Sequence, residues 1–238
     1  MKIDIWSDIH VDHWRDRWRA YVPVERSKVL ICAGDIGEMC WPRAVDTLKE
    51  LCKLWEEVYY LPGNHDYYES SFAHIDPILL KLENEISNLT ILRTGQIHKL
   101  GDYKLIGDTA WVPKHNNLIR YPINDLKLIS DILPGMYNRF SAWRDFLQAE
   151  ADPNTIVVTH HLPAEDCIAA PFKGDNYNCW FMGDCKDIIL DKKPKIYIYG
   201  HTHHAFDFML GETRMICNPQ GYPGERSSNQ LGPITINI

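Results

Sequence analysis

Short apolar runs alternate along this chain with longer stretches in which apolar residues recur every three or four positions. A short continuous run is typical of a strand buried on both faces, and the longer spacing is typical of a helix that packs on a sheet by one side. The clearest runs predict strands at 29–33, 58–61, 155–159 and 195–199. Weaker runs predict further strands at 2–6, 90–93 and 103–107, and antiparallel strands at 205–209, 213–217 and 234–237.

The helical spacing is clearest between the strands expected at 29–33 and 58–61. Val45, Leu48 and Cys52 lie on one helical face there, so we expect a helix over residues 42–56. Similar spacing predicts helices at 75–86, from Phe140 to Leu147, and near 184–191. An alternation of strands and helices is the basic pattern of an α/β fold.

Residues 111–140 have weaker periodicity and contain many prolines, glycines and asparagines. A loop-rich segment of this length inside a compact domain is more often functional than idle. We therefore predict that it determines specificity, with Asn124 and Asp125 as candidate contacts. No repeat, low-complexity tract or linker interrupts the sequence, so we expect residues 1–238 to form a single α/β domain.

The charge balance bears on the partners of the protein. The chain carries 25 basic and 32 acidic residues, a formal net charge of −7. Tight binding of nucleic acid depends on lysines and arginines that neutralise phosphates, so nucleic acid is not expected as a tight partner. A small phosphorylated substrate remains compatible with this charge, because bound divalent cations would supply positive charge locally.

The seven cysteines are scattered and form no Cys-x-x-Cys pair. They are expected to be reduced, with Cys32 and Cys217 in the core, as in a cytoplasmic protein. The amino terminus opens directly into a strand-like run without a signal peptide, and no apolar run approaches the length of a membrane span. We expect a cytoplasmic protein without a membrane partner, and the sequence leaves its oligomeric state open.

Polar groups with metal-binding or catalytic chemistry follow five of the expected strands. They are Asp8 and His10, Asp35, the triplet Asn64, His65 and Asp66, then His160, and finally His201 and His203. Ligands of open α/β sheets bind at the carboxyl ends of strands, and clustered ionisable groups are costly unless they are paired or bound to metal. Carboxylate, imidazole and amide ligands without a thiolate suit Mn, Fe, Zn, Mg or Ni.

The order and spacing of these fragments resemble the calcineurin-like metallophosphoesterase superfamily over nearly the whole chain. The matching fragments are Asp8-x-His10, Gly34-Asp35, Gly63-Asn64-His65-Asp66, His160, Gly200-His201-x-His203 and Asn218-Pro219-x-Gly221-Tyr222. The short cytoplasmic phosphoesterases of bacteria and phages look most similar. The resemblance implies a four-layer α/β-β/α sandwich in which two mixed sheets are flanked by helices, with two divalent metal ions at the strand ends.

The resemblance also implies roles for individual residues. The first ion would be bound by Asp8, His10, Asp35 and His203. Asp35 would bridge to the second ion, whose other ligands would be Asn64, His160 and His201. With manganese as the first candidate metal, a metal-bridging hydroxide would attack the phosphate ester. His65 matches the histidine that protonates the leaving group in this family, and Asp66 would support the site from behind or orient His65.

Several alternatives stay open. Phosphate diesters, including cyclic nucleotides, and small monoesters are both compatible with the motifs. Asp66 stands where the protein-phosphatase members have glutamate, which disfavours a phosphoprotein substrate. A non-catalytic, metal-binding scaffold is a further alternative, although a scaffold would not need a proton donor such as His65. The sequence does not decide whether His161 and His204, each adjacent to a candidate ligand, line the site.

Overall fold

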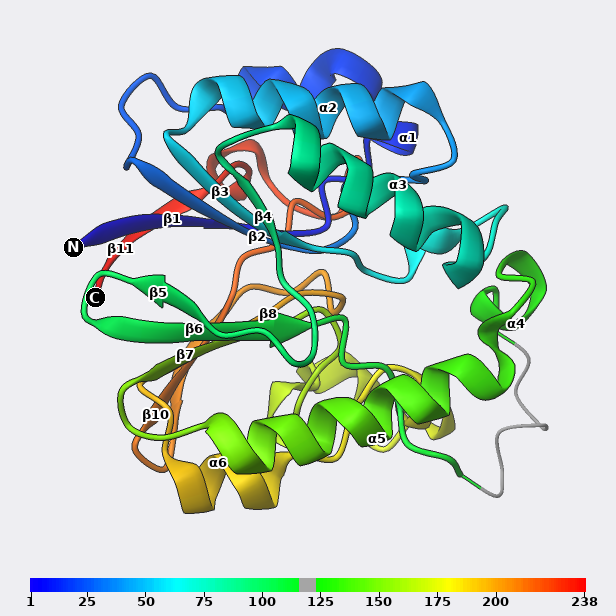
Figure 1. Ribbon diagram of the computed structural model, residues 1–238, viewed down its shortest axis with the longest axis vertical. Coiled ribbons are helices and arrows are strands. Elements are labelled where there is room, and N and C mark those ends of the chain that lie inside the picture. The colour runs from blue at the N-terminus through cyan, green and yellow to red at the C-terminus, as the bar shows by residue number, and fades with distance from the viewer. Residues whose placement is uncertain (116–122) are drawn as a thin grey trace.

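The computed structural model describes residues 1–115 and 123–238, so part of the segment expected to determine specificity, residues 116–122, lies outside the described residues. Two mixed sheets pack face to face, and helices cover both outer faces (Figure 1). The first sheet has the order β11 (Ile234–Asn237), β1 (Lys2–Trp6), β2 (Val29–Ala33), β3 (Glu57–Leu61) and β4 (Leu89–Ile91). Strands β1 to β4 are parallel, and β11 is antiparallel to β1.

The second sheet has the order β5 (His98–Leu100), β6 (Tyr103–Asp108), β7 (Thr155–Thr159), β8 (Ile196–Tyr199), β10 (Thr213–Cys217) and β9 (Phe206–Leu210). Its four central strands are parallel, and the edge strands β5 and β9 are antiparallel to their neighbours. The expected antiparallel tail strands are confirmed for β11 with β1 and for β9 with β10, but β10 also pairs with β8, and that pairing is parallel. After β9 the chain reverses through a tight turn, so that β10 inserts between β9 and β8 and runs parallel to β8.

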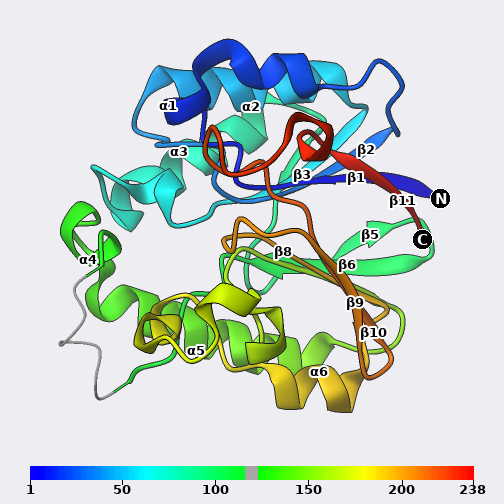
Figure 2. The ribbon, with the colours of Figure 1, turned by 180° about the vertical axis from the view of Figure 1, so that it is seen from behind.

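The helices form the two outer layers (Figures 1 and 2). On the first sheet lie α1 (Val11–Trp14), α2 (Pro42–Leu54) and α3 (Phe72–Glu85). On the second lie α5 (Ile132–Glu150) and α6 (Lys186–Lys192), while α4 (Asp125–Leu128) precedes α5. Short 3₁₀ turns occur at Arg15–Tyr21, His65–Tyr67, Glu165–Cys167, Ala170–Phe172, Asn176–Trp180 and Ser228–Gln230. The four-layer arrangement and the two mixed sheets are confirmed.

The backbone of α5 is non-helical at Leu133, so the regular helix begins at Pro134, six residues before the helix expected at Phe140, and the segment 111–140 is less loop-rich than its sequence indicated. The buried residues Met136 and Phe140 continue the apolar face that includes Trp143 and Leu147. Pro134 and Gly135 made this stretch resemble a loop, but a proline is tolerated in the first turn of a helix.

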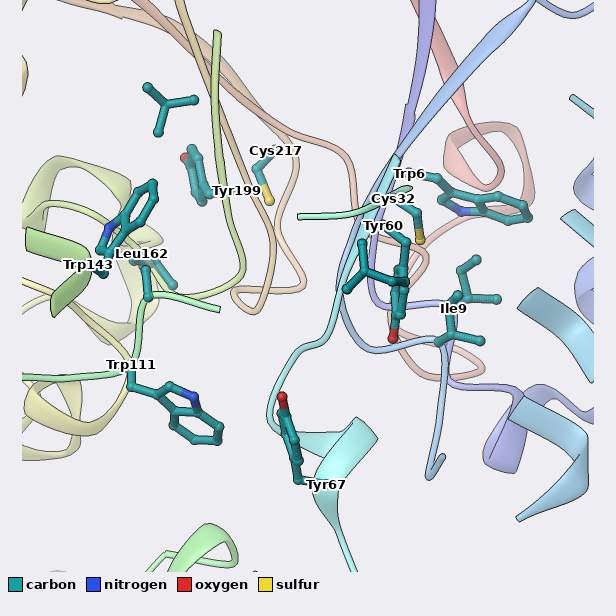
Figure 3. Packing of buried hydrophobic residues seen from close by; sticks show 14 of the residues in the cluster. Trp6, Ile9, Cys32, Tyr60, Tyr67, Trp111, Trp143, Leu162, Tyr199 and Cys217 are labelled. Carbon is teal, nitrogen blue, oxygen red and sulfur yellow. The ribbon is translucent and has the colours of Figure 1, made fainter. Parts of the chain in front are cut away.

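Alternating side chains give each sheet two buried faces. Ile3 and Ile5 of β1 point between the sheets, where they join Val29, Ile31 and other aliphatic residues from both sheets. Residues that point to the opposite, outer faces of the sheets, such as Trp6, pack under the helices. They belong to a second apolar cluster, which extends through both halves of the molecule (Figure 3). Because both faces are covered, the strand ends are where polar side chains can gather.

Two expectations from composition concern the chain as a whole. Cys32 and Cys217 are buried core residues as predicted, and all seven cysteines, each within the described residues, are free. Within residues 1–115 and 123–238, no helix combines the length and the apolar character needed to cross a membrane.

Candidate metal centre

The structure brings all the predicted metal ligands together where strands of both sheets end. They lie on the loops that follow β1, β2, β3, β7 and β8. Hydrogen bonds link these loops across the two sheets. The backbone N–H of His201 donates to Asp8 Oδ1 at 2.9 Å, and His160 Nδ1 lies 2.9 Å from the carbonyl oxygen of Ala33. The carboxyl ends of the strands therefore form one site.

Asp8, His10 and His203 form a first group of donor atoms. His10 Nε2 and His203 Nε2 are 3.0 Å apart, and His203 Nε2 lies 3.5 Å from Asp8 Oδ1. Asp8 and His10 are fully buried, whereas His203 reaches the surface of the cleft. These donor atoms lie close enough together to bind one cation.

Asn64, His160 and His201 form a second group. His160 Nε2 lies 3.1 Å from Asn64 Oδ1 and 3.1 Å from His201 Nδ1. Asp35 belongs to both groups, because its Oδ2 is 3.3 Å from His160 Nε2 and 3.7 Å from His10 Nε2. One buried carboxylate oxygen therefore faces both sets of imidazoles.

The donor atoms fit divalent cations. Ring nitrogens face each other at hydrogen-bond distance, together with carboxylate and amide oxygens, which is the ligand chemistry of a borderline or hard metal. Burial lowers the pKa of His10 and of His201 well below the ordinary value, so both rings are neutral and can donate a lone pair. A cation would also compensate the burial of Asp8 and Asp35.

The backbone of the site is strained. Five of the predicted ligands have left-handed backbone conformations, with φ of 52° at Asp8, 45° at His10, 55° at Asp35, 68° at His201 and 52° at His203. Residues other than glycine rarely adopt positive φ, and such strain persists where the surrounding structure enforces it, often at functional sites. The loops are therefore shaped to aim these side chains at one point.

Hydrogen bonds behind the donors fix the rings. Glu225 Oε2 lies 2.7 Å from His203 Nδ1, and the Ala33 carbonyl holds His160 Nδ1, so that the Nε2 atom of each ring faces the site. The Asn64 amide donates to Asp125 Oδ1 at 2.8 Å, which turns its oxygen toward His160. Asp125 thus contacts a predicted ligand, whereas the sequence indicated a specificity role for it.

Asp66 lies behind the site. Its buried carboxylate accepts backbone N–H bonds from Gly63 at 2.6 Å, Asp35 at 2.9 Å and Gly37 at 3.4 Å. It fastens the loops after β2 and β3 to each other. Among the described contacts it makes no bond to the His65 ring, so the expectation that it orients that ring directly finds no support in the structure.

His65 lies beside the two groups, half-buried, and its ring is clamped by aromatic neighbours. The ring centroids of Tyr68 and His10 lie 4.1 Å and 4.6 Å from that of His65. Its Nε2 atom is 3.3 Å from the hydroxyl of Tyr222. A ring nitrogen of His65 could also join His10 and Asp35 around a cation, so geometry alone allows it to be either a proton donor or a ligand.

The two histidines left undecided by the sequence differ in position. His161 is buried, its ring centroid is 4.5 Å from that of His201, and burial lowers its pKa to about 3. His204 is exposed and lines a pocket of about 620 Å³ beside the site. The pocket is also lined by residues between Leu162 and Phe181, but by no described residue of the segment 111–140.

The close packing of the site predicts a steric requirement at Gly63. A Cβ atom there would overlap Asp35 Oδ1 and lie 2.7 Å from the His160 ring. Gly63→Ala is therefore expected to lower the free energy of unfolding by about 1–3 kcal/mol and to weaken metal binding. Thermal denaturation and metal content provide the measurements.

A glycine in open space provides the control for that substitution. An added Cβ at Gly95 meets nothing within 4 Å, although its φ of +87° means that Gly95→Ala strains the backbone. This control is expected to lower stability by about 1 kcal/mol without changing metal content. Equal metal content in Gly63→Ala and Gly95→Ala would contradict the steric argument.

Comparison with known proteins agrees with this geometry. A sequence model described as calcineurin-like phosphoesterase matches residues 1–205. The chain belongs to the calcineurin-like phosphoesterase family. It is therefore a phosphoester hydrolase of a family that uses divalent metals, and the clusters of histidine and aspartate described above are the candidate metal centre of this calcineurin-like phosphoesterase.

Relatives of this calcineurin-like phosphoesterase include an uncharacterized protein of Acanthamoeba polyphaga mimivirus, 27% identical over 227 residues, which cover 84% of this chain and 80% of the relative. The phosphopantetheinyl hydrolase of Mycobacterium tuberculosis shares the fold with a TM-score of 0.73 at 16% identity, over 98% of this chain and 95% of that one. The Thermus thermophilus protein TT1561 has a TM-score of 0.60 at 13% identity, covering 99% and 98% of the two chains. At these identities the structural likeness shows the fold alone.

Proposed function

We propose that the two donor groups bind two divalent metal ions that share Asp35, and that the enzyme hydrolyses a phosphate diester or a small phosphate monoester. The first ion would be held by Asp8, His10, Asp35 and His203. The second would be held by Asp35, Asn64, His160 and His201. The observation that carries this proposal is the position of Asp35 Oδ2, 3.7 Å from His10 and 3.3 Å from His160.

The bound ions would activate water and neutralise charge on the phosphoryl oxygens, and the chain itself would supply orientation and a proton. His65 would donate its Nε2 proton to the departing oxygen of the ester. Tyr222, with its hydroxyl 3.3 Å from that nitrogen, and Tyr68, stacked on the ring, hold His65 in place. Because Asn64 and His65 are consecutive, the proton donor and a ligand move together with one loop.

We propose a small phosphorylated molecule rather than a nucleic acid or a phosphoprotein as the substrate. The net charge of −7 opposes the approach of a polyanion, and Glu38 interacts electrostatically with Asp12, with Glu69 and with His65. A non-catalytic scaffold would have no use for a ring clamped by Tyr68 and Tyr222 next to the donor atoms.

Metal removal tests the proposal. Treatment with a chelator is expected to abolish hydrolysis of 4-nitrophenyl phosphate and bis(4-nitrophenyl) phosphate, and Mn²⁺ is expected to restore it best or nearly so among Mn, Fe, Zn, Ni and Mg. Turnover and bound metal per chain are measured in the same samples. Full turnover by protein shown to be free of metal would end the proposal, and a stoichiometry of one ion would refute the dinuclear arrangement.

A further inference from the structure

The pocket of about 620 Å³ opens directly beside the candidate metal centre, because His201 and His203 form part of its wall. Its volume is in the range that holds a small organic molecule. Its lining comes mainly from the 3₁₀ turns between Leu162 and Phe181 and from Glu225, Arg226 and Gln230 of the tail. A phosphate ester bound at the metal centre would therefore extend its organic part into this pocket.

The lining made by the 3₁₀ turns is mainly apolar and partly aromatic, with Asp175 and Asn178 as its polar members. Phe181 lies with its ring centroid 4.9 Å from that of His201, and Phe172 lies 5.7 Å from His204. Ile168 and Leu162 complete the apolar part of this lining. Such a surface binds a flat ring or an aliphatic chain by excluding water.

Arg226, in the tail, adds a positive charge to the lining of the pocket. Its Nη1 atom is buried and has no hydrogen-bond partner in the described part of the chain. The carboxylate that interacts with it electrostatically, Asp8, forms no ion pair with it and belongs to the candidate metal centre. The acidic groups that share the pocket are engaged elsewhere. Glu225 holds His203 Nδ1 and the backbone of Tyr222, and Asp175 accepts the backbone N–H of Tyr177.

A buried guanidinium nitrogen without a partner is unfavourable unless a ligand satisfies it. Burial lowers the pKa of Arg226, but a guanidinium stays charged at neutral pH. The ligand that best compensates such a group is an anion with two oxygens, because the planar guanidinium can bind it through two parallel bonds. The charges near His65 are acidic, so the pocket side of the cleft is where an anionic group is favoured.

We propose that the pocket binds the organic part of the substrate and that Arg226 binds a second anionic group on it. The substrate class is then a nucleotide-sized phosphate ester that carries an apolar or ring portion and one further phosphate or carboxylate. This assignment rests on the proposed hydrolysis at the metal centre.

Two probes that differ by one phosphate test the role of Arg226. Thymidine 5′-monophosphate and thymidine 3′,5′-bisphosphate are compared as inhibitors of bis(4-nitrophenyl) phosphate hydrolysis by the metal-loaded enzyme. The inhibition constant of the bisphosphate is expected to be about tenfold lower than that of the monophosphate, because one additional charge-assisted hydrogen bond strengthens binding by about that factor. The shift in melting temperature caused by each probe gives a measure of binding that does not depend on turnover.

The variants identify the group responsible. In Arg226→Gln the preference for the bisphosphate is expected to fall to about twofold or less, and in Arg226→Lys to be partly retained, because a lysine keeps the charge but not the paired donors. Arg43→Gln removes an exposed charge on helix α2 and should keep the full preference. The melting temperature without ligand shows whether each variant is folded. If Arg226→Gln does not fold, the preference of Arg226→Lys for the bisphosphate decides whether Arg226 is the group responsible.

Equal inhibition by the two probes in the unmodified enzyme would overturn the proposal, and so would an unchanged preference in Arg226→Gln. The failure of the proposed function looks different. In that case the metal-loaded enzyme hydrolyses none of the nitrophenyl esters, while the melting shifts of the two probes still report on the pocket.

Discussion

Asp35→Asn is expected to lower kcat/KM by at least about 10³-fold, equivalent to about 4 kcal/mol of barrier, because the variant would lose the carboxylate proposed to serve both cations. The amide that replaces it is neutral and offers a single acceptor oxygen, so each proposed ion would lose a charged ligand. No other predicted ligand faces both donor groups, since Asp8 and His203 lie in the first and Asn64 and His201 in the second. His201→Asn and His203→Asn are therefore expected to lose less activity than Asp35→Asn.

The measurement is kcat/KM on bis(4-nitrophenyl) phosphate together with metal content. Asp46→Asn is the matched control, because Asp46 is exposed on helix α2 and the change in charge is the same. The backbone N–H of His65 donates to Asp35 Oδ1 at 2.9 Å, so a melting curve must accompany each variant to detect loss of structure. A folded Asp35→Asn enzyme with two ions and normal turnover would refute the shared-ligand assignment.

His65→Asn is expected to lower kcat on alkyl phosphate esters by about 10²–10⁴-fold while leaving metal content unchanged. An alkoxide is a poor leaving group and needs a proton in the transition state, whereas 4-nitrophenolate is a stable anion at neutral pH. The loss on nitrophenyl esters should therefore be much smaller. The selectivity of this loss distinguishes a proton donor from a ligand.

Both substrate types and the bound metal are measured on the same preparation, with His74→Asn as the control, because His74 is exposed on helix α3. Equal losses on both esters with metal retained would mean that His65 stabilises charge on the phosphoryl group. Loss of one ion would mean that His65 is a ligand, an arrangement that the proximity of His10, Asp35 and His65 also allows.

The sequence predicted those parts of the fold that depend on local pattern. The apolar runs at 29–33 and 155–159 became strands β2 and β7 with the same bounds, and the face of Val45, Leu48 and Cys52 became helix α2. Strand β5 has no apolar run, since two of its three residues are His98 and Lys99, and the directions of the pairs that β10 forms depend on which strands flank it. Pairing over long distances leaves no periodic signal in the sequence.

The same division applies to the candidate site. The residues that follow strands could be located, because each strand end predicted where its ligand would lie. Side chains that approach the site from elsewhere had no such signal, notably Tyr68, Asp125, Glu225 and Arg226. Tyr222 belongs to a run that resembles the family, but its contact with His65 depends on how the tail folds back and has no signal in the sequence.

The left-handed backbone at five predicted ligands lowers the stability of the fold, although the side chains at these positions are proposed to be needed for activity. Such a residue costs on the order of 1–3 kcal/mol, and glycine or asparagine adopts the same conformation more easily. A directed-evolution experiment that selects only for survival on heating would therefore favour replacement of Asp35 or His201, the residues that hydrolysis is proposed to require. The more thermostable variants would then be inactive, unless the selection also requires turnover.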